Sequence, residues 1–256
     1  PEREMTIRDL LTHTSGLTYG FMQSTAVDAM YREQAVEQSK SLEEMVQKLA
    51  KIPLLFSPGT RWSYSVATDV CGYLVEKISK IPFDDFLREQ IFEPLSMEDT
   101  GFFVPDEKIH RFAANYQRTE NDGLQLFDSP ETSHYQRSPG LFSGGGGLVS
   151  TVHDYYKFAS MLLNQGEYEG TRLLGRKTVE LMTSNHMPGN GDLASMGQAI
   201  FSESTYDGIG FGLGFSVMLD PATAQILGTA GEFAWGGAAS TYFFIDPDED
   251  MLVIFL

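Results

Sequence analysis

The sequence predicts an α+β fold, with helices in the first part of the chain and antiparallel strands in the last. Apolar residues recur at helical spacing in several segments before residue 186. From Phe211 onward the period falls from about 3.6 residues to about 2, which is typical of strands. Because helices come first and consecutive strands come last, we expect segregated parts rather than a doubly wound parallel sheet.

Capping patterns and helical spacing locate the helices. Thr6-Ile7-Arg8-Asp9 has the capping-box pattern, with Asp9 in place of the usual Glu, and Gly16 is a suitable stop after that helix. Ser41-Leu42-Glu43-Glu44 is a full capping box that opens a second helix, which Pro53 ends. Four more are expected: Val66 to Ile78, one starting at Pro82, one that Thr151 caps, and one from about Arg176 to Ser184.

Strands are expected in four segments near the C-terminus, which are 211–219, 224–230, 239–245 and 251–256. The last two are joined by Asp246-Pro247-Asp248-Glu249-Asp250, which indicates a solvated hairpin turn. Residues 18–40 are mixed, 93–140 are rich in turn formers, and 186–210 are glycine-rich and polar. We expect 186–210 to be a long loop.

The composition excludes several kinds of partner. The 256 residues carry a net charge of −17, which would repel nucleic acid and anionic membrane surfaces. No apolar run is long enough for a transmembrane helix. Cys71 is the single cysteine, so no internal disulfide can form, and its apolar helix predicts a small buried hydrophobe rather than a reactive thiol. Compartment and oligomeric state stay undefined.

Glycine and histidine patterns predict no cofactor and no metal. Gly144–Gly147 lacks the lysine of a phosphate-binding loop, so a tight turn with close packing is expected. Gly208–Gly214 leads into a strand rather than a helix, which argues against dinucleotide binding. The five histidines form no H-x-x-x-H pair. His13 could act as a general base or could be a hydrogen-bonded loop anchor.

The stretch Ser57–Asp69 is the best candidate for chemistry. A turn at Ser57-Pro58-Gly59 leads to Tyr64, just before the helix expected from Val66. A tyrosine with an ordinary pKa near ~10 is a poor base unless cations or positive dipoles lower that pKa. A helix N-terminus supplies some positive potential, and such a base suits a serine nucleophile with a lysine neighbour.

A second stretch, Trp235-Gly236-Gly237-Ala238, has the features of an oxyanion hole. Its two glycines would let a substrate approach the backbone closely. The Ala238 N–H could then point outward, toward a developing negative charge.

Five stretches carry a family resemblance: Ile7–Leu17, Phe56–Ser65, Ile91–Phe102, Gly145–Thr151 and Trp235–Gly237. In this order they resemble the serine hydrolases with the class C β-lactamase fold, in particular the family VIII carboxylesterases. The resemblance implies a β-lactamase/transpeptidase-like fold, in which a helical region packs beside an antiparallel sheet with flanking helices. It implies one domain over residues 1–256, with the helical region at about 1–140 and the sheet subdomain at about 141–256.

The resemblance also implies a covalent acyl-enzyme mechanism. Tyr64 corresponds to the family's tyrosine base, Trp235-Gly236-Gly237 to its edge-strand motif, and Ala238 to one oxyanion N–H. A Ser-x-x-Lys motif supplies the nucleophile, yet none of the eight lysines here has a serine three residues before it. We expect the motif before Pro1, in a longer protein from which both ends are missing, and we expect this chain alone to be inactive.

Two positions favour esters over charged antibiotics. Val66 stands where related β-lactamases usually carry Asn, and Trp235 stands where they carry Lys. The leading hypothesis is therefore a serine hydrolase that cleaves short-acyl carboxylic esters. A β-lactamase or D-alanyl-D-alanine peptidase stays open as an alternative, as does a catalytically inactive binding scaffold. The expected partner is a small-molecule ester or amide.

Overall fold

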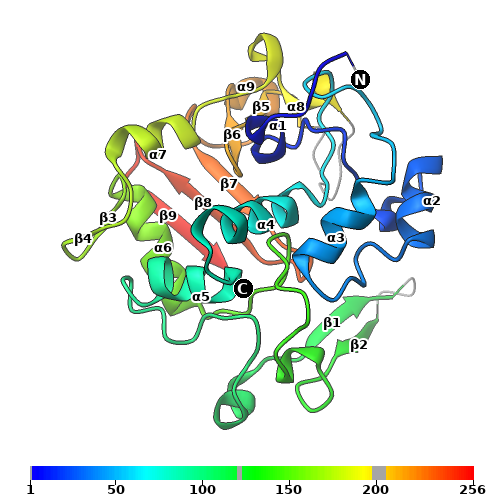
Figure 1. The fold of residues 1–256 in the computed structure, drawn as a ribbon. Coiled ribbons are helices and arrows are strands. Elements are labelled where there is room, and N and C mark those ends of the chain that lie inside the picture. Colours follow the sequence, from blue (N-terminus) through cyan, green and yellow to red (C-terminus); the bar gives the residue numbers. More distant parts are fainter. Residues whose placement is uncertain (1, 120–122, 198–205) are drawn as a thin grey trace.

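The computed structural model describes residues 2–119, 123–197 and 206–256. Among the helices of the first part, α2 (Ala26–Glu33) and α3 (Leu42–Leu49) lie toward the right of the view, with α2 at the periphery (Figure 1). The C-terminal strands form a sheet with α6 (Val152–Leu163) beside it. This segregation confirms the predicted α+β class.

The remaining elements connect these two parts. The other α-helices are α1 (Ile7–Leu11), α4 (Ala67–Ser79), α5 (Phe83–Leu87), α7 (Arg176–Met182), α8 (Leu193–Met196) and α9 (Pro221–Ala224). Short 3-10 helices are η1 (Gly20–Met22), η3 (Asp106–Arg111), η4 (His134–Gln136) and η5 (Pro188–Asn190), and η2 (Arg88–Phe92) continues α5 as a π-helix.

Side-chain caps begin the helices as the sequence predicts. The Thr6 hydroxyl accepts the Asp9 N–H at 3.3 Å, and the Ser41 hydroxyl accepts the Glu44 N–H at 3.1 Å. The Glu44 carboxylate, however, accepts the Lys40 N–H at 2.9 Å. The capping box predicted at Ser41 is therefore only half formed.

Two helices end earlier than the sequence predicts. Helix α1 ends at Leu11, and Gly16 instead occupies a turn with φ 84°, where a side chain would collide with the Phe56 carbonyl oxygen. Helix α3 ends at Leu49, before Pro53.

The large sheet is an antiparallel meander with the strand order β5-β6-β7-β8-β9. Register pairs Phe233 with Ile245, and Ile245 with Leu252, so these side chains share the face that packs with α6. The strands are β5 (Ile209–Phe211), β6 (Ser216–Met218), β7 (Phe233–Gly236), β8 (Tyr242–Asp246) and β9 (Met251–Phe255).

Two small hairpins complete the strands. Strands β1 (Asn115–Arg118) and β2 (Leu124–Asp128) form one, and β3 (Glu167–Tyr168) and β4 (Thr171–Arg172) form the other. The first lies within the turn-rich region 93–140, where the sequence predicts no strand. Of the loop predicted over 186–210, residues 198–205 lie outside the described residues, and the rest contains η5, α8 and part of β5.

Of the four predicted strands, one is interrupted by a turn and one is absent. The segment 211–219 folds into a hairpin instead, because the Gly212 N–H donates to the Phe215 carbonyl at 2.7 Å and turns the chain. The segment 224–230 contains no strand, since Asp220 caps α9 and β7 begins only at Phe233. The other two predicted strands, now β8 and β9, are present.

Each part has its own apolar core. The helical part buries Leu10, Tyr31, Met45 and Val66, while the sheet part buries residues of α6 against the inner face of β6 to β8. Cys71 packs half-buried against the helical core, and burial raises the pKa of its thiol to about 11, which fits an inert role. No helix in the described ranges is both long and apolar enough to span a bilayer.

Candidate active site

Two segments far apart in sequence lie side by side at Tyr64. The Ser63 N–H donates to the His13 carbonyl at 2.8 Å, and the Val66 N–H donates to the Thr18 carbonyl at 3.3 Å. Tyr64 lies between these two bonds, just before α4 begins. Its backbone is therefore held on both sides, although it belongs to no helix or strand.

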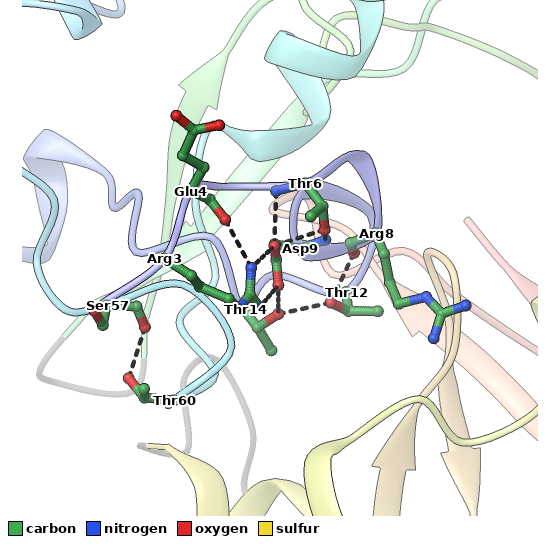
Figure 2. Close-up of polar contacts among 9 residues, drawn as sticks. All are labelled: Arg3, Glu4, Thr6, Arg8, Asp9, Thr12, Thr14, Ser57 and Thr60. Carbon is green, nitrogen blue, oxygen red and sulfur yellow. Dashed lines mark hydrogen bonds and ion pairs between the residues drawn. The ribbon is translucent and has the colours of Figure 1, made fainter. Parts of the chain in front are cut away.

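The first of these segments is fixed by a buried acid (Figure 2). Asp9 is 4% exposed and receives both terminal guanidinium nitrogens of Arg3, at 2.7 and 2.6 Å, and the Thr6 N–H at 2.8 Å. The Thr14 hydroxyl donates to its other side at 3.3 Å. Burial alone would raise the pKa of Asp9, but these bonds outweigh it and hold that pKa well below its usual range. Asp9 therefore stays ionised and fixes the turn that carries His13.

Aromatic rings surround Tyr64. The centroid of its ring is 4.8 Å from that of His13, 5.3 Å from Tyr19, 5.5 Å from Trp235 and 6.5 Å from Trp62. Trp235 belongs to β7, whereas the other three rings belong to the helical part. Tyr64 therefore lies where the two parts meet.

Burial dominates the ionisation of Tyr64. Desolvation raises the pKa of its hydroxyl, hydrogen bonds with Trp235 and Tyr19 lower it, and the negative charge of Asp69 raises it; the net shift is upward. None of these contributors, within the part of the chain that the structure describes, is a cation. A base at this position therefore needs a positive group beside it.

His13 is a buried anchor in this structure. Its side chain is 2% exposed, and its Nδ1 lies 3.3 Å from the hydroxyl of Ser65, which is 0% exposed. Burial lowers the pKa of His13 to about 3, so the ring is neutral. A Ser–His pair without access to solvent cannot meet a substrate, and the loop-anchor interpretation fits these contacts.

Strand β7 is not the edge strand that the resemblance implies, because it is the third of five strands. Its partner β6 extends only to the pair Ser216–Ala234, whereas β8 pairs with it as far as Gly236. From Trp235 onward, the described sheet leaves one side of β7 unpaired. The Trp235 end of the strand therefore keeps an open edge although its beginning does not.

The backbone after Trp235 is accessible. Gly236, Gly237 and Ala238 are exposed, and the Gly237 N–H donates to the Thr241 carbonyl at 2.8 Å. Ala238 follows in the turn to β8, and within the described chain its N–H has no acceptor. That N–H is thus free for an outside oxygen.

Val66 lies elsewhere than its expected role requires. Its side chain is 0% exposed and packs in the helical core with Leu10 and Leu17. As the N-cap residue of α4, it supports the helix that follows Tyr64. A substrate has no surface of Val66 to touch here, and its effect on ester preference stays a prediction.

Three residues near Tyr64 were not singled out from the sequence. Tyr19 contacts Tyr64 directly, and Asp69 is 3% exposed in the first turn of α4. The Ser143 hydroxyl donates to Asp69 Oδ1 at 2.5 Å. In the sequence, Asp69 could have been noticed because it is a lone acid in the first turn of an apolar helix.

The glycine loop packs against α4, as the sequence predicts. A Cβ at Gly145 would lie 2.8 Å from the Tyr19 hydroxyl and 2.9 Å from Asp69 Oδ2. At Gly144 it would collide with the Thr68 carbonyl oxygen. Close packing therefore requires glycine at both positions.

Two cavities differ in their relation to Tyr64. One of about 860 Å³ is lined by Thr18, Phe21, Trp62 and Ser63, among others, so it opens beside the Tyr64 segment. Another of about 370 Å³ is lined around Phe102 and includes none of the candidate residues. Neither cavity is lined by Tyr64, Trp235 or Ala238, and the first is only the nearer of the two to Tyr64 along the chain, through Trp62 and Ser63. The described ranges hold no group of three or more His, Cys, Asp or Glu able to bind a metal ion.

Comparisons with known proteins agree on one family. The sequence model of the family described as Beta-lactamase matches residues 1–256. Protein Rv1367c of Mycobacterium tuberculosis is 37% identical over 259 residues, which are 99% of this chain and 62% of that protein. Esterase EstB of Burkholderia gladioli is 30% identical over 271 residues, which are 98% of this chain and 64% of that enzyme. The chain thus spans less than two thirds of the length of these relatives.

A solved structure has the same architecture. EstCE1, described as a hydrolase with promiscuous acyltransferase activity, matches with a TM-score of 0.78 and 26% sequence identity. The match covers 98% of this chain and 66% of that one.

Proposed function

The chain belongs to the beta-lactamase family and has its α+β fold, and from this premise we propose that it is part of a serine hydrolase that cleaves short-acyl carboxylic esters. One observation carries the proposal: Tyr64 contacts Trp235, and the strand that bears Trp235 continues to Ala238, whose N–H has no acceptor among the described residues. A hydroxyl that can exchange a proton and an N–H that can bind an oxyanion then belong to one junction.

The proposed reaction has two halves. A serine hydroxyl attacks the ester carbonyl carbon, Tyr64 takes the serine proton, and the Ala238 N–H stabilises the oxyanion. The tetrahedral intermediate collapses, and the alcohol leaves with the proton from Tyr64. Water then attacks the acyl-serine in the same way, so the products are one alcohol and one carboxylic acid.

The nucleophile is not in this sequence as a Ser-x-x-Lys motif. We propose that this motif lies N-terminal to Pro1 in the sequence. In the folded full-length protein, its lysine would lie beside Tyr64 and supply the positive group that the tyrosine needs. A lysine ammonium beside Tyr64 would lower the pKa of the tyrosine, against the effect of burial.

The surroundings of Tyr64 favour neutral esters over charged substrates. Trp235 presents an indole, not a cation, beside Tyr64. Two of the similar proteins, EstB and EstCE1, are named as an esterase and as a hydrolase. The cavity lined by Trp62 and Ser63, the residues just before Tyr64, is large enough for a small ester.

The test uses the full-length protein and p-nitrophenyl butyrate. We expect Tyr64→Phe to lower kcat/KM by about 10²–10⁴-fold, the usual effect of removing a general base. Tyr116→Phe is the matched control, because Tyr116 is 56% exposed on β1. No turnover by the unmutated protein, or full activity in Tyr64→Phe, contradicts the proposal.

The family itself supports a second candidate, a β-lactamase or D-alanyl-D-alanine peptidase. Efficient hydrolysis of a chromogenic cephalosporin, with poor ester turnover, would favour it. An upstream gene sequence without Ser-x-x-Lys would instead favour an inactive binding scaffold.

A further inference from the structure

Asp69 is a buried acid that no ion pair in the described ranges neutralises. It is 3% exposed, in the first turn of α4. Its Oδ1 accepts the Ser143 hydroxyl at 2.5 Å and the Gly145 N–H at 3.4 Å. Burying a carboxylate costs free energy unless it is paired and hydrogen-bonded. Two hydrogen bonds to one oxygen offset only part of that cost.

The second oxygen of Asp69 faces the tyrosines. Oδ2 and the Tyr19 hydroxyl lie 2.9 and 2.8 Å from the same point, the place where Gly145 lacks a Cβ. The Tyr19 ring in turn lies 5.3 Å from that of Tyr64. The carboxylate and the Tyr19 hydroxyl therefore both lie beside Gly145, and Tyr19 connects this pair to Tyr64.

The other ionisable groups around this cluster do not cancel the charge. His13 contacts Tyr64 but is neutral because burial depresses its pKa. Glu37 adds negative charge near Asp69, and Cys71 has a raised pKa and stays a thiol. Among the groups that the structure places here, Asp69 is the charge that acts on Tyr64.

We propose that Asp69 is a positioning residue for Tyr64, which holds the glycine loop through Oδ1 and opposes the loss of the Tyr64 proton through its charge. This inference rests on the proposed function, in which Tyr64 is the base. The negative charge of Asp69 also favours the protonated form of a lysine beside Tyr64. Asp69 would therefore help to keep the lysine that the mechanism requires in its ammonium form.

Two substitutions separate the charge from the loop contact. Asp69→Asn keeps an oxygen for Ser143 and Gly145 and removes the charge. On the acid side of the pH profile, kcat/KM for a neutral ester falls as Tyr64 takes up a proton. In Asp69→Asn we expect this acid limb to move to lower pH by about one unit, because the fraction of deprotonated Tyr64 at a given pH on the limb rises roughly tenfold. Ser143→Ala keeps the carboxyl group but removes a hydrogen bond that favours its ionised form. It should therefore lower activity and shift the limb less than Asp69→Asn does. An unmoved limb in Asp69→Asn overturns the proposal.

A second measurement does not depend on activity. In protein labelled with 3-fluorotyrosine, the ¹⁹F resonance of Tyr64 is the one missing from Tyr64→Phe. It should titrate at lower pH in Asp69→Asn than in the unmutated protein. Without ester turnover, this shift would still support the charge effect while the proposed function fails, and an unchanged titration would overturn the inference.

If Asp69→Asn does not fold, the Tyr64 resonance can be followed during a pH titration of the unmutated protein instead. The Tyr64 resonance should move as Asp69 takes up a proton, at a pH above the ordinary carboxyl range because burial raises the pKa of Asp69. The resonance of Tyr116, exposed on β1, should stay in place. A Tyr64 resonance that ignores this protonation contradicts the inference.

Discussion

The side chains around Tyr64 are ionisable, yet burial keeps most of them neutral. It lowers the pKa of His13 to about 3 and raises the pKa of both Tyr19 and Tyr64. In such surroundings the effective dielectric constant is low, so one added charge acts strongly. The proposed lysine and the acid Asp69 would each have a large effect for this reason.

His13 makes stability depend on pH. Its folded pKa of about 3 lies below the ordinary value of 6.5, so the unfolded chain binds a proton that the folded chain does not. The stabilisation is complete above pH ~6.5 and is lost as the pH falls toward 3. At pH 5 this residue should cost about 2 kcal/mol of the free energy of unfolding, relative to pH 7.5.

Urea unfolding at pH 7.5 and pH 5 measures this loss. In His13→Asn, the loss of unfolding free energy between pH 7.5 and pH 5 should be smaller by about 2 kcal/mol. Asn is a suitable replacement because it tolerates the φ of 54° at this position. His134→Asn is the control, since His134 is exposed, and it should leave the pH dependence unchanged. An equal loss in His13→Asn and the unmutated protein would contradict the assignment.

At the scale of elements, the contact of the glycine loop with α4 joins the helical part to the segment before α6. Its effect on stability can be tested with neighbouring glycines. Gly144→Ala would place a Cβ against the Thr68 carbonyl oxygen, which belongs to the backbone and cannot rotate away. We expect it to lower the free energy of unfolding by about 1–3 kcal/mol.

Gly146→Ala is the matched control for this prediction. A Cβ there has no heavy atom within 4 Å, and its φ is not in the left-handed region. Urea unfolding should therefore show a change of about 0.5 kcal/mol or less. Equal destabilisation by both substitutions would mean that loss of glycine flexibility, not contact with α4, explains the effect.

Local signals predicted the elements that depend on local contacts. The caps at Thr6 and Thr151 are readable because the bonded groups are three residues apart. The hairpin after Phe211 has a local bond from Gly212 to Phe215, but Gly212 is also confined by the Met182 carbonyl oxygen, thirty residues earlier, which local spacing does not report. The β1–β2 hairpin was missed because its strands are mostly exposed and carry no alternation of buried residues.

At the scale of the whole molecule, the candidate site exists only where the two parts meet. Motifs nominated Tyr64 and Trp235 separately, but their 5.5 Å contact is a property of the fold. Asp69 was missed because its partner Ser143 lies 74 residues away. Residues whose roles come from distant partners cannot be identified from spacing in one sequence.

The net charge of −17 should also affect substrate choice. A carboxylate-bearing ester approaches a negative molecule, and salt screens this repulsion, since the Debye length falls from about 30 Å at 0.01 M to about 8 Å at 0.15 M. With the full-length protein, provided that its other residues leave the net charge strongly negative, kcat/KM for such an ester should rise about two- to fivefold over this range, while a neutral ester of similar size stays unchanged. Trp235→Lys provides the contrast, because a local cation beside Tyr64 would favour the carboxylate and weaken or reverse its salt dependence. If kcat/KM for the anionic ester does not change with salt in the unmutated protein, the net charge has no effect on substrates at the site. The indole of Trp235 would then be the feature that disfavours charged substrates.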